Sequence, residues 1–187
     1  MRLNRKFFNR NTVDVAKELL GKYLIRKVNG KIIKAKIIET EAYCGTRDLA
    51  CHASKGSTPR TKVMFGPAGF TYIYLIYGMY HCLNIVTEKE GYPAAVLIRG
   101  VSGILYPVSG IKKSDSQIRD TIFNGPGKVC RELKIDRGLN NIDITKSKEI
   151  WIENLGDQID PRQIKIGKRI GVDYAGKWKD KLWRFYL

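Results

Sequence analysis

Two carboxylates and a tyrosine occur at alternate positions of one otherwise apolar stretch of the chain. Glu39, Glu41 and Tyr43 would share one face of a strand, with the two acidic positions about 6.6 Å apart. Burying acidic groups costs free energy, so this pattern needs a reason. One reason is a carboxylate that activates water for attack at a sugar carbon. The alternative is an exposed strand edge whose acids pair with Lys34 or Lys36.

A second stretch, residues 70–80, is dense in tyrosine. Tyr72 and Tyr74 would lie on one strand face, where their rings could stack on an extruded base. Tyr77 adjoins Gly78 at an expected turn, where an exposed aromatic ring could wedge into a base stack. Tyrosine also favours strands in general, so ordinary packing remains an alternative for most of these residues.

His52 lies in a loop that carries glycine, serine and proline, and loops on a rigid scaffold often hold functional residues. A hydrogen-bonded surface histidine is the plainer alternative. The adjacent pairs Cys51-His52 and His81-Cys82 raise the question of zinc. Neighbours in an extended chain point in opposite directions, and this spacing is not that of a tetrahedral site. We therefore expect no metal and no cofactor.

The charge balance points to a polyanionic partner. Lys and Arg total 34 against 18 for Asp and Glu, which gives a net charge of +16. Such an excess favours nucleic acid, although a solvated basic surface would also produce it.

Length and composition indicate an ordinary globular protein. The chain has 187 residues, of which 43% are hydrophobic and 28% charged, as in a single folded domain spanning 1–187. No apolar run has the length of a secretory signal or a membrane helix, and none of the four cysteines forms a C-x-x-C pair. These features predict a cytoplasmic protein with no membrane partner.

The elements that would position these residues can be read from periodicity and turn signals. Asn11 can cap a helix over 11–20, and Asn29-Gly30 predicts a hairpin between strands 23–27 and 31–43. Further strands are expected over 70–76, 80–87 and 94–101, and short ones near Trp151, Ile166 and Phe185. Residues 44–69 and the end of 103–120 read as loops. We predict an α+β fold with a curved, mixed and largely antiparallel β-sheet and a few packed helices.

A second helix is expected from Gly125-Pro126 to about residue 133. Its start could hold a phosphate, or it could be a plain helix start.

Taken in order, the motifs resemble the alkyladenine (3-methyladenine) DNA glycosylase family. Glu39-Thr-Glu-Ala-Tyr43 and Ile76-Tyr-Gly-Met-Tyr80 are its most specific strings. The resemblance runs from about residue 7 to the end and includes His52, Thr58-Pro-Arg60, Met64-Phe65, Asn84-Ile85, Val96-Leu-Ile-Arg99, Gly125-Pro126 and Arg184-Phe-Tyr186. By this resemblance, the long N-terminal extension of animal relatives is expected to be absent. The family varies in the loop that holds His52, and the variable loop around 106–120 leaves DNA contacts there undefined.

The resemblance implies a role for each matched residue. Glu41 would be the general base and Arg99 would lie near it and the attacking water, while Glu39 would be structural. The flipped base would be contacted by Tyr43 and His52, stacked by Tyr74 and screened by Asn84 against the amine of guanine. Tyr77 would wedge into the duplex.

The resemblance also implies an activity. The protein would be a monofunctional glycosylase of base excision repair that removes 3-methyladenine, 7-methylguanine and hypoxanthine from double-stranded DNA. It would be a monomer with no obligate protein partner, associated with the nucleoid in a bacterium. A nucleic-acid-binding protein without enzymatic activity remains an alternative, and so does a glycan hydrolase that needs both carboxylates.

Overall fold

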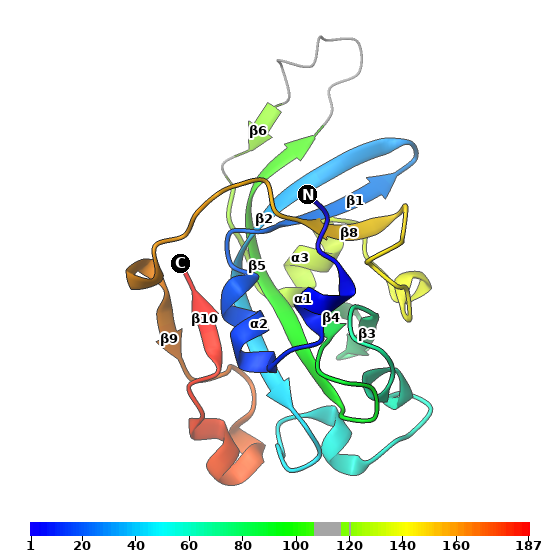
Figure 1. Cartoon of the computed structure of the whole chain (residues 1–187), viewed down its shortest axis with the longest axis vertical. Helices are drawn as coiled ribbons and strands as arrows, with labels where there is room; N and C mark the ends of the chain where they lie inside the picture. Colours follow the sequence, from blue (N-terminus) through cyan, green and yellow to red (C-terminus); the bar gives the residue numbers. More distant parts are fainter. Residues whose placement is uncertain (107–116, 120) are drawn as a thin grey trace.

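Two long antiparallel strands form the centre of the molecule. The structure is a computed structural model that describes residues 1–106, 117–119 and 121–187. Strand β2 (Lys31–Cys44) pairs along most of its length with β5 (Ala94–Tyr106), and Figure 1 shows both crossing the whole molecule. The strand predicted over 94–101 is longer than expected, and β5 continues to Tyr106. The loop prediction for the end of 103–120 is wrong over Gln117–Arg119, which pair with β5 as a short strand, and residues 107–116 and 120 lie outside the described residues.

The remaining strands extend this central pair into one sheet. Its main path runs β3-β4-β5-β2-β1-β8, with β3 (Thr71–Ile76), β4 (Tyr80–Val86), β1 (Tyr23–Val28) and β8 (Ile150–Glu153). Four short strands attach beside it: β6 (Gln117–Arg119) and β7 (Phe123–Asn124) on β5, and β10 (Arg184–Tyr186) on β2 with β9 (Lys165–Gly167) outside it. Every pairing among the described strands is antiparallel, which confirms the predicted α+β fold with its largely antiparallel sheet.

Irregular register bends the two central strands where the acidic residues lie. Along β2 and β5, Ile37 faces Val101, Glu39 faces Gly100 and Thr40 faces Ile98. Arg99 is therefore an extra residue on β5, and such bulges bend a strand and redirect a side chain. A β-carbon at Gly100 would lie 2.9 Å from that of Glu39, so only glycine fits there.

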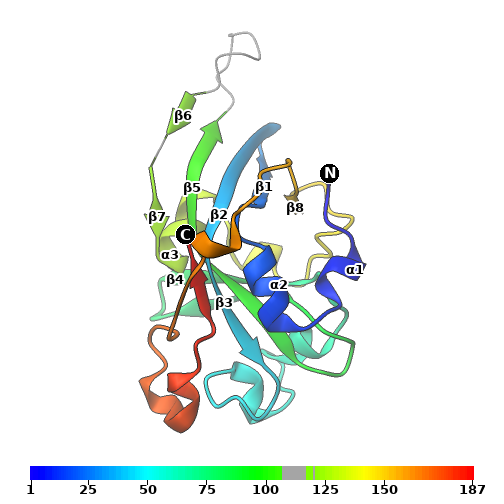
Figure 2. The same cartoon turned by 60° about the vertical axis from the view of Figure 1, so that its left-hand side comes forward.

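In the part of the chain that the structure describes, three short α-helices cover parts of the sheet. The predicted first helix is confirmed as α2 (Thr12–Glu18), capped by the Asn11 side chain, which accepts from the amides of Val13 and Asp14. The helix α3 (Pro126–Glu132) is also confirmed, whereas α1 (Arg5–Phe8) was not expected. Figure 2 shows α1 and α2 together on the same side of the sheet. In the described residues no helix is long and apolar enough to cross a membrane.

The loop that follows β2 and the end of the chain meet at one end of the molecule. The loop carries two short 3-10 helices, η1 (His52–Lys55) and η2 (Lys62–Phe65), and the chain end carries a third, η5 (Asp173–Asp180). Figures 1 and 2 both show these segments, in cyan and orange-red, at the lower end of β2. This juxtaposition brings residues from distant parts of the sequence around the acidic face of β2.

Candidate active site

Glu41 is a fully buried carboxylate with a complete set of partners. Its Oε2 accepts a hydrogen bond from the Tyr43 hydroxyl at 2.7 Å, and its Oε1 accepts one from the amide of Ile170 at 2.9 Å. The Arg99 Nε lies 3.6 Å from the same Oε1. Because Glu41 and Tyr43 are alternate residues of β2, the strand itself aims both at one place.

Glu39 lies on the same face but is occupied by two arginines. Its Oε1 is 3.1 Å from the Arg99 Nε and 3.3 Å from the Arg184 Nη1. The alternative of an exposed edge paired with lysines is wrong, since both acids are buried and Lys36 pairs with Asp157 at 2.7 Å. Arg99 is thus shared between two carboxylates, and Glu39 is the one more fully neutralised.

Burial makes Glu41 more basic than an ordinary glutamate. Loss of solvent raises its pKa, and the charge of Glu39 adds to this, while Arg99, the Tyr43 hydroxyl and the Ile170 amide act in the opposite direction. Burial and the neighbouring carboxylate raise the pKa of Tyr43 well above its ordinary value, so its hydroxyl stays protonated and donates. The pair can therefore hold a carboxylate that accepts a proton from water.

An aromatic recess is lined in part by Tyr43, the residue that donates to Glu41. It is a small recess, open to solvent, and is lined by Tyr43, Ala50, His52, Met64, Tyr72, Tyr74 and Asn84. The structure thus brings together the four residues that the sequence predicted for base binding. Recesses with aromatic walls and a few polar groups are typical of small-ligand sites.

His52 is held in this wall by the two strand tyrosines. Its Nδ1 is hydrogen-bonded to the Tyr72 hydroxyl at 2.9 Å, and its ring centroid lies 4.5 Å from that of Tyr74. Burial, together with the positive charges of Arg60 and Lys55, lowers the pKa of His52 to about 4. The imidazole is therefore neutral at neutral pH.

Asn84 is buried in the wall of the recess, with its amide nitrogen 3.2 Å from the backbone carbonyl oxygen of Tyr72. This bond fixes the orientation of the side chain.

Tyr77 lies outside the recess, at the tip of the β3–β4 hairpin. Its side chain is 81% exposed, and its backbone φ is +52°, in the left-handed region that bulky residues avoid. Met79 and Tyr80 are exposed beside it. An exposed aromatic ring held in a strained backbone is a reason to look for function.

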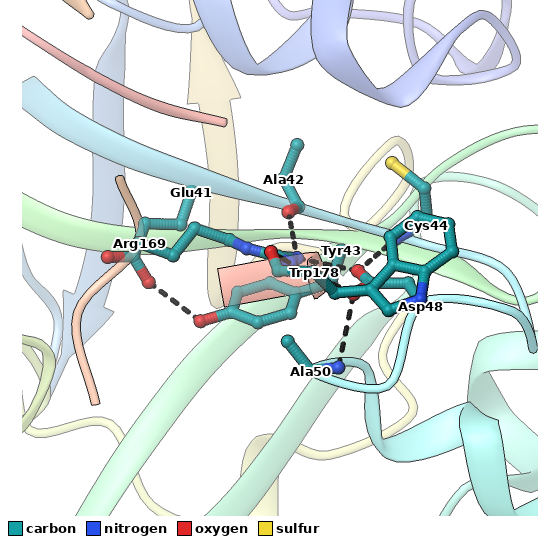
Figure 3. Close-up of polar contacts among 8 residues, drawn as sticks. All are labelled: Glu41, Ala42, Tyr43, Cys44, Asp48, Ala50, Arg169 and Trp178. Carbon is teal, nitrogen blue, oxygen red and sulfur yellow. Dashed lines mark hydrogen bonds and ion pairs between the residues drawn. The ribbon is translucent and has the colours of Figure 1, made fainter. Parts of the chain in front are cut away.

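Three residues that complete the site, Asp48, Arg169 and Ile170, stand in none of the motifs that the sequence offered. The Arg169 side chain reaches behind Tyr43, with its guanidinium 4.8 Å from the centre of that ring, and it is paired with Asp48. Figure 3 shows this pair, with Arg169 also reaching the carbonyl of Ala42. The third residue, Ile170, contributes a backbone amide, for which no side-chain signal exists.

The cysteine–histidine pairs do not converge. Across the described ranges 1–106, 117–119 and 121–187, no group of three or more His, Cys, Asp or Glu side chains is placed to hold a metal ion. His52 is instead bonded to a tyrosine.

Comparison with known proteins identifies the family. The model of a family described as methylpurine-DNA glycosylase matches residues 6–187. A protein of Methanocella arvoryzae is 47% identical, with 98% of this chain and 91% of that protein covered. One of Clostridium perfringens is 46% identical (100% and 96% covered), and one of Legionella pneumophila is 47% identical (100% and 94% covered). All three are provisionally named as 3-methyladenine DNA glycosylases. The resemblance seen in the sequence is thereby confirmed, and the chain belongs to the methylpurine-DNA glycosylase family of DNA repair enzymes.

Proposed function

We propose that this glycosylase rotates an alkylated or deaminated purine out of duplex DNA and hydrolyses its N-glycosidic bond. The observation that carries this proposal is the buried Glu41 carboxylate, held by Tyr43 beside an aromatic recess. A base inside a duplex cannot reach a buried carboxylate, so the nucleotide has to leave the stack first. The substrates we propose are 3-methyladenine, 7-methylguanine and hypoxanthine.

Glu41 acts as general base in this proposal. A water molecule attacks the anomeric sugar carbon, passes a proton to Glu41, and the carbon–nitrogen bond breaks with its electron pair leaving on the base. The raised pKa of Glu41 supports the role, because it makes the carboxylate a better proton acceptor. Arg99, 3.6 Å away, acts in the opposite direction and favours the ionised form of Glu41, which the reaction requires.

The walls of the recess fit a positively charged base. N-alkylated purines such as 7-methylguanine carry a positive charge, and cations stack favourably on tyrosine rings. Tyr43 and Tyr74 supply such rings, and the neutral His52 does not repel the charge. Asn84, fixed by its bond to the Tyr72 carbonyl, is proposed to exclude the exocyclic amine of guanine.

Tyr77 is proposed to fill the gap that the flipped nucleotide leaves. Wedge residues inserted between base steps hold a duplex in a distorted state. The exposure of Tyr77 and its strained backbone at a hairpin tip support this role. The net charge of +16 would hold the phosphates on either side.

We propose that the enzyme is monofunctional and acts as a monomer of one domain spanning 1–187, associated with the nucleoid. A lyase step needs an amine nucleophile. In the described part of the chain no lysine lines the recess.

The test is release of free base. The protein is incubated with a duplex that carries one hypoxanthine and, separately, with methylated genomic DNA, and released bases are quantified. The proposal expects release from both without strand cleavage. Tight binding without release would favour the non-enzymatic alternative, and a borohydride-trapped covalent adduct would contradict the monofunctional mechanism.

A further inference from the structure

An ion pair behind the recess has no role in the proposed chemistry. Asp48 and Arg169 are both fully buried, and two bonds join them, Nη1 to Oδ2 at 2.5 Å and Nη2 to Oδ1 at 2.9 Å. Arg169 also donates to the carbonyls of Ala42 (2.9 Å) and Trp178 (3.0 Å). Replacing such a pair by apolar residues is often neutral or stabilising, so stability alone is a poor reason for it.

The Arg169 guanidinium supports the aromatic wall from behind. It lies 4.8 Å from the centre of the Tyr43 ring and 5.1 Å from that of Trp183, so it packs against both rings. Four hydrogen bonds hold it in place, which fixes the position against which Tyr43 packs. The side chain that donates to Glu41 is thereby held as well.

The same residue holds a second donor to Glu41. Ile170 follows Arg169 in the chain, and its amide donates to Glu41 Oε1 at 2.9 Å. Anchoring Arg169 to Asp48 and to the Ala42 carbonyl of β2 fixes the position of this amide. Figure 3 shows Arg169, Tyr43 and Glu41 gathered over the same stretch of β2.

Asp48 connects this arrangement to the loop that carries His52. Its carboxylate accepts from the amides of Cys44 (3.2 Å) and Ala50 (3.1 Å), so it fixes the first turn after β2. Ala50 and His52 both line the recess. One ion pair thus ties together β2, the loop after it and the C-terminal segment.

We propose that Asp48 and Arg169 are positioning residues that set the geometry of the general base Glu41 and of the base-stacking ring of Tyr43. This inference rests on the proposed function. A misplacement of about 1 Å at a reacting group lowers the rate by on the order of 10²-fold. Loosening the pair should therefore slow excision without weakening the grip on undamaged DNA.

The test compares two variants with a matched control. Asp48→Asn removes only the charge, and Arg169→Lys keeps a cation but loses the two-pronged geometry. The control, Asp143→Asn, breaks another arginine–aspartate pair, Arg5–Asp143 at 2.5 Å, which does not line the recess. Each protein is measured for Tm, for affinity to an undamaged duplex and for single-turnover release of hypoxanthine at saturating enzyme.

The inference expects both site variants to excise about 10- to 100-fold more slowly per folded molecule. Their affinity for undamaged duplex should stay within about twofold of wild type, and the control should excise normally. The excision rate is expected to fall at low pH as Glu41 becomes protonated, and we call this part of the pH–rate profile the acid limb. In both site variants the acid limb should move to higher pH, because losing the Ile170 donor raises the pKa of Glu41. The titratable or charged groups that act on Glu41 or feel its charge are Glu39, Tyr43, Arg99, Tyr74 and Cys82.

The inference would be overturned if the site variants excised at the wild-type rate per folded molecule and their acid limb did not move. It would also be overturned if the Asp143→Asn control lost excision to the same extent. If both site variants fail to fold, Trp183→Leu decides, because it removes a ring from Arg169 without leaving a buried charge unpaired. It should slow excision several-fold and shift the limb the same way, and a wild-type profile would overturn the inference. Failure of the wild-type protein to release base is a separate result that refutes the proposed function instead.

Discussion

The hydroxyl of Tyr43 provides a test of how Glu41 is tuned. Tyr43→Phe keeps the ring that lines the recess and removes only the group that donates to Glu41 Oε2 at 2.7 Å. The Ile170 amide and Arg99 remain on Oε1. The substitution therefore isolates one of the interactions that lower the pKa of Glu41.

The size of the effect follows from the strength of that bond. A hydrogen bond to a charged group contributes about 1.5–3 kcal/mol, and a pH unit corresponds to about 1.36 kcal/mol. Losing a donor to the ionised form raises the pKa of Glu41, so the acid limb of the excision rate should move upward by about one to two pH units. Well above that limb, Glu41 is ionised in both proteins and their rates should converge.

The assay is single-turnover release of hypoxanthine from a duplex across the pH range in which the protein stays folded. Wild type and Tyr43→Phe are compared at saturating enzyme, so that differences in DNA affinity do not enter. A rate lowered equally at every pH, with no shift in its pH dependence, would contradict the role of the hydroxyl in tuning Glu41. The hydroxyl would then act on the substrate rather than on Glu41.

Three further predictions concern stability and DNA binding. Glu41→Gln should have a Tm at pH 8 no lower than that of wild type, because burial disfavours the ionised acid in the folded state. This destabilisation of wild type is complete above the pKa of Glu41 in the folded protein and fades as the pH falls through that pKa. Calorimetry at lower pH should therefore show a smaller difference in Tm between the two proteins. Tyr77→Gly should leave Tm about unchanged, since relief of about 1 kcal/mol of strain in the left-handed backbone offsets a similar entropic cost of glycine. The variant should nevertheless excise a lesion from duplex DNA more slowly, with a smaller effect on the same lesion in a single strand. Equal slowing on both substrates would argue against a wedge. Affinity for undamaged duplex, measured by fluorescence anisotropy, should fall by about 10²-fold between 50 and 200 mM salt, which is the value expected for about four phosphate contacts. An affinity that does not change with salt would argue against binding through the net charge of +16.

Local signals in the sequence predict most of the sheet. The turn at Asn29-Gly30 forms as expected, with φ of 49° and 77°. Alternation places Glu39, Glu41 and Tyr43 on one face of β2 as predicted, and it also brings the Tyr72 and Tyr74 rings to 5.4 Å from each other. These features depend only on neighbours in the chain.

Features that depend on distant contacts could not be predicted from local signals. The β-bulge that directs Arg99 to both carboxylates arises from the pairing of β2 with β5. Asp48 and Arg169 are 121 positions apart in the sequence, and neither stands in a motif. The helix α1 has four residues, too few for a periodic signal, and such a short helix relies on tertiary packing.

The most direct test of the account is the behaviour of Glu41→Gln on a duplex that carries a single hypoxanthine. If Glu41 is the general base, this variant binds the damaged duplex as tightly as wild type, within about twofold, while release of free hypoxanthine falls below detection. Such a split would assign Glu41 to the chemical step. Release at a rate close to that of wild type would contradict the account, because the water would then be activated by another group.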